Sequence, residues 1–265
     1  QFRLPHEFPE EVLQEVRAAA RAFDPDGELS NREDLTNTLT ITIDPDDAKD
    51  YDDAITLERL SGGKSESRSH GKGSAPAAWE LGIHIADVSA FVPEGGPTDA
   101  EAILRGTSVY LPRFVIPMLP ESLSNGLCSL QEGEPRLCKS AFIRYDAGGN
   151  VIGARFANSV IKSAKRLTYR QATAVLDGDD SQPAEVTALI KRMDTLARIL
   201  QRRRYADGMI SLELPEVELI LDDDGRVVDA RPEDTSFSHT IIEMFMVEAN
   251  EAVARLLHSL DVPFI

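Results

Sequence analysis

The chain has 265 residues, 42% of them hydrophobic, and a formal net charge of −17. No apolar run approaches the roughly 18 residues of a membrane span, and the N-terminus lacks the apolar core of a secretory signal, so we expect a cytoplasmic protein with no membrane partner. Cys128 and Cys138 are the two cysteines, and the absence of a CxxC pair argues against a disulfide framework or a zinc site. Because the chain is acidic, any binding of nucleic acid has to be local.

Hydrophobic periodicity predicts both helices and strands. Helices are expected over residues 9–23, 98–105, 168–177, 184–205 and 237–260. Strands are expected over residues 39–43, 54–60 and 79–92, with hairpins at 136–146/151–163 and 211–221/226–230. Because hairpins replace βαβ repeats, the pattern indicates an α+β fold in which helices pack on a mixed, largely antiparallel sheet.

The chemistry is concentrated in the segment ITIDPDDAKDYDDAI, residues 41–55. Six aspartates fall within ten positions: Asp44, Asp46, Asp47, Asp50, Asp52 and Asp53. Carboxylates this close raise one another's pKa, and a hard divalent cation would neutralise them. A calcium loop is excluded because the positions that need Gly and Glu hold Lys49 and Ile55.

An exposed acidic turn is the alternative to a metal site, since Asp-Pro and Asp-Asp are also turn sequences. The strand that precedes the segment weakens this alternative, because Ile41 and Ile43 would mount Asp44 rigidly at its end. Two Mg²⁺ ions held by carboxylates are a usual means of cleaving phosphodiesters. The spacing therefore favours a nuclease.

Four segments carry a family resemblance: TIDPDDAKDYDDAI, WELGIHIADVSAFV, YLPRFVIPMLPESLSNGLCSL and IIEMFMVEAN. Together they resemble the RNB catalytic domain of the ribonuclease II/ribonuclease R family of bacterial 3′→5′ exoribonucleases, and PHEFPEEVLQEV is closer to the ribonuclease R branch. The resemblance implies an RNB-type fold over residues 38–265, preceded by a helix and linker over 1–37. It also marks 61–78 as a flexible insertion. Contact of its Lys64, Arg68 and Lys72 with RNA is one interpretation, but a disordered insertion that does not alter the chemistry is favoured.

The resemblance also implies the catalytic residues. Asp44, Asp50, Asp52 and Asp53 match the four active-site aspartates of the family. Asp44, Asp50 and Asp53 would hold Mg²⁺, with Mn²⁺ as the other candidate. Loss of Asp52 would stop the chemistry.

Residues that bind RNA are implied in the same way. Tyr110, Tyr169 and Glu243 match positions that contact the substrate, whereas without the resemblance Tyr110 would be a core residue and Glu243 a surface residue. Arg166 and Arg170 lie in residues 151–176, which hold five basic and no acidic side chains, and we assign both to RNA binding. A second basic run, over 191–204, fits a solvated helix face.

Two departures from the family pattern matter. Leu212 stands where the family has an aromatic residue that stacks on the last bases, so half of that clamp is in doubt. The chain also stops at Ile265, before the segment that supplies a catalytic arginine in the family, and the cold-shock and S1 domains of the family lie outside it. We therefore expect a domain that is incomplete at its C-terminal end and is inactive by itself.

The resulting prediction is a Mg²⁺-dependent 3′→5′ exoribonuclease core that hydrolyses single-stranded RNA to nucleoside 5′-monophosphates. Two alternatives stay open. One is a fragment that binds RNA without cutting it, and the other is a different metal-dependent phosphodiesterase, such as a DNA exonuclease.

Overall fold

The computed structural model describes residues 5–60, 77–111, 114–212, 217–222, 224–232 and 236–264. Lys64, Arg68, Lys72 and all but the last two residues of the predicted insertion at 61–78 lie outside the described residues. Within the described ranges, no helix has both the length and the apolar character needed to cross a membrane.

Seven strands form one sheet in the order β1-β8-β7-β4-β3-β2-β9. Their bounds are β1 Glu33–Leu35, β2 Ile41–Asp44, β3 Asp53–Arg59, β4 Trp79–Ala86, β7 Pro135–Tyr145, β8 Val151–Lys162 and β9 Lys165–Thr168. The two outer pairs, β1 with β8 and β2 with β9, are parallel, and the four pairs between them are antiparallel. The sheet thus confirms the predicted α+β fold with mixed, largely antiparallel strands.

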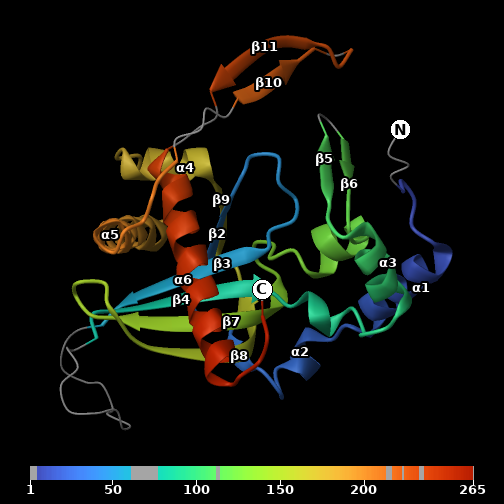
Figure 1. The fold of residues 1–265 in the computed structure, drawn as a ribbon, viewed down its shortest axis with the longest axis horizontal. Helices are drawn as coiled ribbons and strands as arrows, with labels where there is room; N and C mark the ends of the chain where they lie inside the picture. The colour runs from blue at the N-terminus through green and yellow to red at the C-terminus, as the bar shows by residue number, and fades with distance from the viewer. Residues whose placement is uncertain are drawn as a thin grey trace.

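Helices cover the sheet in two groups (Figure 1). Helix α6 (Phe237–Ser259) crosses the front of the sheet, and α4 (Tyr169–Leu176) and α5 (Ala184–Ala206) lie beside it. Their apolar residues, such as Phe245, share one core cluster with Ile55 and Ile83 of the sheet. A second cluster joins Val16 of helix α1 (Glu10–Ala22) to Leu137 of β7. Because core lies against both faces, β2 and most of β3 are continuously buried.

The short helices α2 (Pro25–Glu28) and α3 (Pro97–Arg105) belong with α1 to the second group of helices.

The beginning of α4 is fixed by a reciprocal cap. The Thr168 hydroxyl accepts from Gln171 N at 3.2 Å, and Gln171 Oε1 accepts from Thr168 N at 2.9 Å. Strand β9 therefore ends at the residue before Tyr169, which becomes the first residue of the helix.

One predicted boundary is wrong. The strand expected over 79–92 ends at Ala86 and is followed by a 3₁₀ turn, η1 (Val88–Ala90). Asp87 causes the change of direction, since its Oδ1 accepts from Ser89 Oγ at 2.6 Å.

The second predicted hairpin is present as β10 (Val217–Leu221) and β11 (Val227–Pro232), a two-stranded sheet that stands apart from the main sheet (Figure 1). Another hairpin, β5 (Val109–Leu111) with β6 (Phe114–Ile116), was not predicted, and neither was the π-helix η2 (Ser122–Leu127). Each of these segments is too short to show a period in the sequence.

The basic run of α5 is only partly a solvated face, contrary to expectation. Arg203 and Arg204 point inward and form ion pairs with Glu248 of α6, which is 2% exposed. Two arginines that contact one buried carboxylate are part of the helix packing, so they are not available on the surface.

Candidate active site

The aspartate segment forms the connection between two strands that diverge. Asp44 is the last residue of β2, and Asp53 is the first residue of β3. The two strands pair directly at Ile41 and Ile55, whereas β2 pairs with β9 along its whole length, up to Asp44 opposite Thr168. Residues 45–52, which we call the aspartate loop, therefore open out beyond the ends of these strands.

Asp44 and Asp53 are carboxylates in a partly dry environment. Asp44 is 6% exposed, and its Oδ2 has no hydrogen-bond partner. Burial raises the pKa of Asp44 to about 7, and the charge of Asp53 adds to the increase. Burial likewise raises the pKa of Asp53 to about 6, with a further contribution from Asp52. The charge of Arg166 lowers the pKa of Asp44 in part, but the charge on both carboxylates stays unfavourable.

Asp52 and Asp50 continue the same cluster. Asp52 is an exposed residue, yet partial burial of its carboxyl group raises its pKa and the charge of Asp50 raises it further. The Asp52 carbonyl accepts from Ala86 N at 2.9 Å, which ties this part of the loop to the end of β4. The structure thereby brings all four predicted aspartates into one series of interacting charges.

Carboxylate oxygens in this setting suit a hard divalent cation such as Mg²⁺ or Mn²⁺. The unpartnered, buried Oδ2 of Asp44 is the atom that most clearly needs a cation or a donor. Among the described residues, no group of three or more His, Cys, Asp or Glu side chains is so arranged that it could hold a metal ion. The donors therefore fit the metal in their chemistry, and their assignment as ligands stays a prediction.

Arg166 and Arg170 contact the beginning of the aspartate loop. Arg166 Nη2 donates to the carbonyl of Pro45 at 2.7 Å, and its guanidinium carbon lies 5.1 Å from the centre of the Tyr51 ring. Arg170 Nε lies 3.4 Å from Asp46 Oδ2, with both side chains largely exposed. In this structure Arg166 supports the loop, and the RNA contacts of both arginines stay predictions.

A shallow pocket of about 440 Å³ borders the loop. It is lined by Lys49, Tyr51, Asn125, Gln131, Glu132 and Arg166. Glu132 orders one wall of the pocket, because its Oε2 accepts from Arg166 N at 3.0 Å and its Oε1 pairs with Lys165 Nζ at 3.1 Å.

The two predicted tyrosines flank the aspartates. Tyr110, on the hairpin β5–β6, is 70% exposed, and its pKa is raised by partial burial and by the charges of Asp50 and Asp52. Tyr169 is half-buried, and burial raises its pKa to about 12, with contributions from Asp53 and Asp44. One tyrosine thus lies near each half of the cluster.

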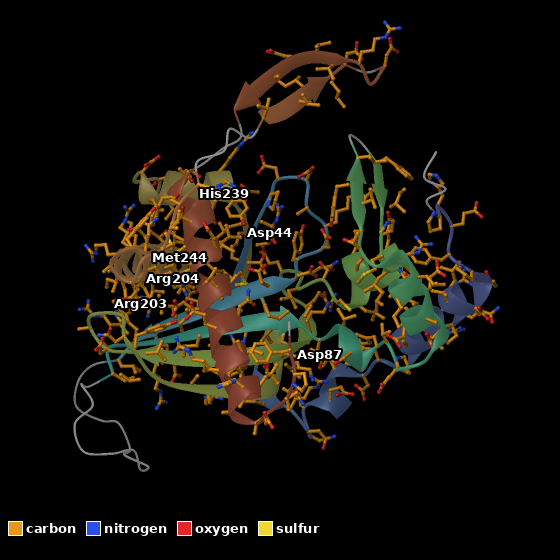
Figure 2. The ribbon with its side chains drawn as sticks, viewed as in Figure 1. Asp44, Asp87, Arg203, Arg204, His239 and Met244 are labelled. Carbon is orange, nitrogen blue, oxygen red and sulfur yellow. The ribbon has the colours of Figure 1, made fainter. Side chains whose placement is uncertain are left out.

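His239 is a residue of the site that the sequence reasoning missed. Its ring stacks on that of Tyr169, with centroids 3.7 Å apart and an angle of 22° between the planes. Figure 2 shows His239 at the end of α6 that lies nearest Asp44. The signal was present in SHTIIEMF, because His239 lies four residues before Glu243 and so shares its helix face. Glu243 itself is exposed on α6.

The structure does not test the prediction that Leu212 replaces one aromatic residue of the clamp. Its side chain is 78% exposed, and residues 213–216, which follow it, lie outside the described residues. The loss of the aromatic partner at this position stays a prediction.

The comparisons with known proteins agree on one family. Residues 32–265 match the RNB domain. Ribonuclease R of Thermotoga maritima is 43% identical over 98% of this chain, and the match covers 35% of that protein. The structure of Mycoplasma genitalium RNase R in complex with ribose methylated single-stranded RNA superimposes with a TM-score of 0.86, at 29% identity, over 97% of this chain and 38% of that one.

The structure of the same Mycoplasma genitalium protein in complex with double-stranded RNA gives a TM-score of 0.86 at 30% identity, over 98% of this chain and 44% of that chain. A more distant match, yeast Ssd1, is described as a pseudonuclease and shares the fold at 20% identity, with a TM-score of 0.64 over 88% of this chain and 27% of that one. The chain spans about a third of the length of the curated relatives that it matches.

Proposed function

Because the chain belongs to the RNB domain family, we propose that it is the catalytic core of a 3′→5′ exoribonuclease that acts on single-stranded RNA. The observation that carries the proposal is the aspartate cluster, in which Asp44, Asp52 and Asp53 share raised pKa values at one edge of the sheet. Groups with perturbed pKa values that converge at one place are typical of catalytic sites.

In the proposed mechanism, Asp44, Asp50 and Asp53 would hold the metal. Bound Mg²⁺ or Mn²⁺ would supply an activated water and neutralise charge on the departing oxygen. Asp52, at the exposed end of the cluster, orients the attacking water by accepting a hydrogen bond from it. Water adds to the phosphorus, the 3′ oxygen of the shortened strand leaves with a proton, and a nucleoside 5′-monophosphate is released.

Substrate binding in this proposal uses the two tyrosines. His239 covers one face of the Tyr169 ring, so a terminal base stacks on the opposite face. Such stacking contributes about 1–3 kcal/mol per base and does not depend on sequence. Tyr110 lies near Asp50 and Asp52, where it contacts the strand beyond the scissile phosphate.

The test is product analysis on a single-stranded RNA labelled at its 3′ end. We expect labelled mononucleotide as the first product with Mg²⁺ or Mn²⁺, and none after chelation. The longest form of the protein that carries these 265 residues should be assayed beside the chain itself, since the relatives are about three times as long. Release of internal oligonucleotides would contradict an exonuclease.

Two alternatives predict different outcomes. The similarity to Ssd1 shows that this fold occurs in a protein described as a pseudonuclease, so binding without cleavage is the second candidate function. RNA binding without nucleotide release, under the conditions above, would favour it. A DNA exonuclease would be indicated if DNA of the same sequence competed as well as RNA, because 2′-hydroxyl contacts distinguish the two.

A further inference from the structure

Ser129 makes an unusual pair of hydrogen bonds with the aspartate loop. Its side chain is fully buried. Its Oγ donates to the carbonyl of Lys49 at 2.8 Å and accepts from the backbone N–H of Tyr51 at 3.1 Å. These groups belong to the residues on either side of Asp50, so a single hydroxyl spans that aspartate.

Ser129 is itself held by the sheet. Arg136 Nε, in β7, donates to the Ser129 carbonyl at 2.9 Å, and Leu130 N donates to the Tyr51 carbonyl at 2.8 Å. A continuous series of hydrogen bonds thus runs from the central sheet through Ser129 to the loop. The position of Asp50 is therefore linked to a rigid part of the fold.

The loop needs such a partner because the strands on either side of it have separated. Backbone N–H and C=O groups away from water require partners. Here the Lys49 carbonyl requires a donor and the Tyr51 N–H requires an acceptor. A hydroxyl supplies both from one atom, which an alanine or a free thiol does poorly or not at all. Removing it would leave two backbone groups unpaired next to Asp50.

We propose that Ser129 is a positioning residue for Asp50, an inference that rests on the proposed function. By fixing the peptide units before and after Asp50, Ser129 keeps that carboxylate beside Asp52. Displacements of about 1 Å in a catalytic group are enough to reduce turnover substantially. The effect of Ser129 should therefore fall on kcat, whereas RNA contacts elsewhere are preserved.

The experiment compares Ser129→Ala and Ser129→Thr with the parent, in the longest form of the protein that carries these residues. For Ser129→Ala we expect kcat for mononucleotide release to fall at least about tenfold, with KM changed less than about threefold. Amide hydrogen exchange at Tyr51 should rise by a similar factor. Ser129→Thr keeps the hydroxyl and should restore both values toward those of the parent.

Ser159→Ala is the matched control. Ser159 is also fully buried, but its hydroxyl bonds that of Ser140 at 2.6 Å, inside the sheet, so Tyr51 exchange should stay at the parent rate. Unchanged Tyr51 exchange in Ser129→Ala, or an equal increase in Ser159→Ala, would overturn the inference. A parent that releases no nucleotide would instead contradict the proposed function, and the exchange data would still decide the role of Ser129.

Discussion

Asp44 occupies a position that disfavours its own charge. Its Oδ2 is buried without a partner, and both burial and the neighbouring Asp53 raise its pKa to about 7. A residue chosen for stability alone would be neutral here, because an unpaired buried charge costs free energy. This cost is explained if a cation binds the carboxylate and neutralises its charge. A site that is unfavourable for stability but needed for function is common in proteins.

Replacing Asp44 by Asn should therefore stabilise the metal-free chain, by about 1 kcal/mol, because the disfavoured charge is removed. In the parent, millimolar Mg²⁺ or Mn²⁺ should raise the melting temperature by linkage, and Asp44→Asn should lose most of that increase. Thermal melts with and without a chelator test both statements. Asp47→Asn, an exposed aspartate in the same loop, is the control. If neither metal changed the melting temperature of the parent, the acidic-turn alternative would be favoured.

Asp52 differs from Asp44 in that it is exposed. Asp52→Asn should leave the free energy of unfolding nearly unchanged and should abolish RNA hydrolysis, because in the proposed mechanism its carboxylate acts on the reacting groups in the transition state. RNA affinity should change by less than about threefold, since most of the affinity comes from phosphate contacts spread along the strand. Initial rates and a binding titration on the same oligonucleotide measure the two effects. Hydrolysis within tenfold of the parent would remove Asp52 from the mechanism.

At the scale of helices and strands, one buried carboxylate links α5, α6 and β7. Glu248 of α6 accepts from Arg204 Nη2 of α5 at 2.7 Å and from the Tyr145 hydroxyl of β7 at 3.0 Å, and it also pairs with Arg203. Burial, followed by the charge of Glu248, raises the pKa of Tyr145, so this phenol stays a donor. The network fixes α6, whose first turn carries His239.

Removing this carboxylate should be strongly destabilising. Glu248→Ala takes the buried carboxylate away from Arg203 and leaves Arg204 with Glu251 as its ion-pair partner, so we expect a loss of about 3–5 kcal/mol in the free energy of unfolding. Glu251 pairs with the same Arg204 at 2.7 Å but is 40% exposed at its side chain, and Glu251→Ala should cost less than about 1 kcal/mol. Urea unfolding of both variants provides the comparison. Equal losses would mean that Glu248 acts through packing alone.

Long, periodic elements were predictable, whereas short ones that depend on distant partners were not. The helix over 237–260 and the first hairpin show clear periods, and the structure places them within a residue or so of the predicted bounds. Strand β9 has four residues, and its partner β2 lies more than a hundred positions earlier in the chain. No local pattern reports such a pairing.

The same distinction applies to the site. The aspartates lie within ten positions of the sequence, so their spacing and the family resemblance were enough to predict them as site residues. Ser129 and His239 act through contacts with residues that are far away in the chain, Tyr51 and Tyr169. The inward orientation of Arg203 was hidden for the same reason, because a basic run does not reveal which of its members faces a buried Glu248.

At the scale of the whole molecule, a series of hydrogen bonds crosses four neighbouring strands of the sheet. It runs from the Thr56 hydroxyl to His84 Nε2 at 3.1 Å, from His84 Nδ1 to Ser140 Oγ at 2.7 Å, and on to Ser159 Oγ at 2.6 Å. His84 is completely buried, and burial, aided by the charge of Arg155, lowers its pKa to about 3. The ring is therefore neutral near pH 7, with one donor and one acceptor nitrogen.

This neutral histidine should make the fold sensitive to acid. Its pKa is about 3 in the folded chain and about 6.5 when unfolded. Between these two pH values only the unfolded state binds the proton. The contribution of neutral His84 to the free energy of unfolding is therefore complete above pH 6.5, and it is lost at about 1.4 kcal/mol per pH unit as the pH falls below that value. Asp44 and Asp53 act in the opposite direction, because their raised pKa values favour the folded state on acidification.

Comparison with His84→Gln, which cannot titrate, isolates the histidine. The parent's stability relative to that variant should fall by about 2–3 kcal/mol between pH 6.5 and 4.5 in urea titrations, whereas parallel pH profiles would mean that His84 is protonated in the folded state as readily as in the unfolded one.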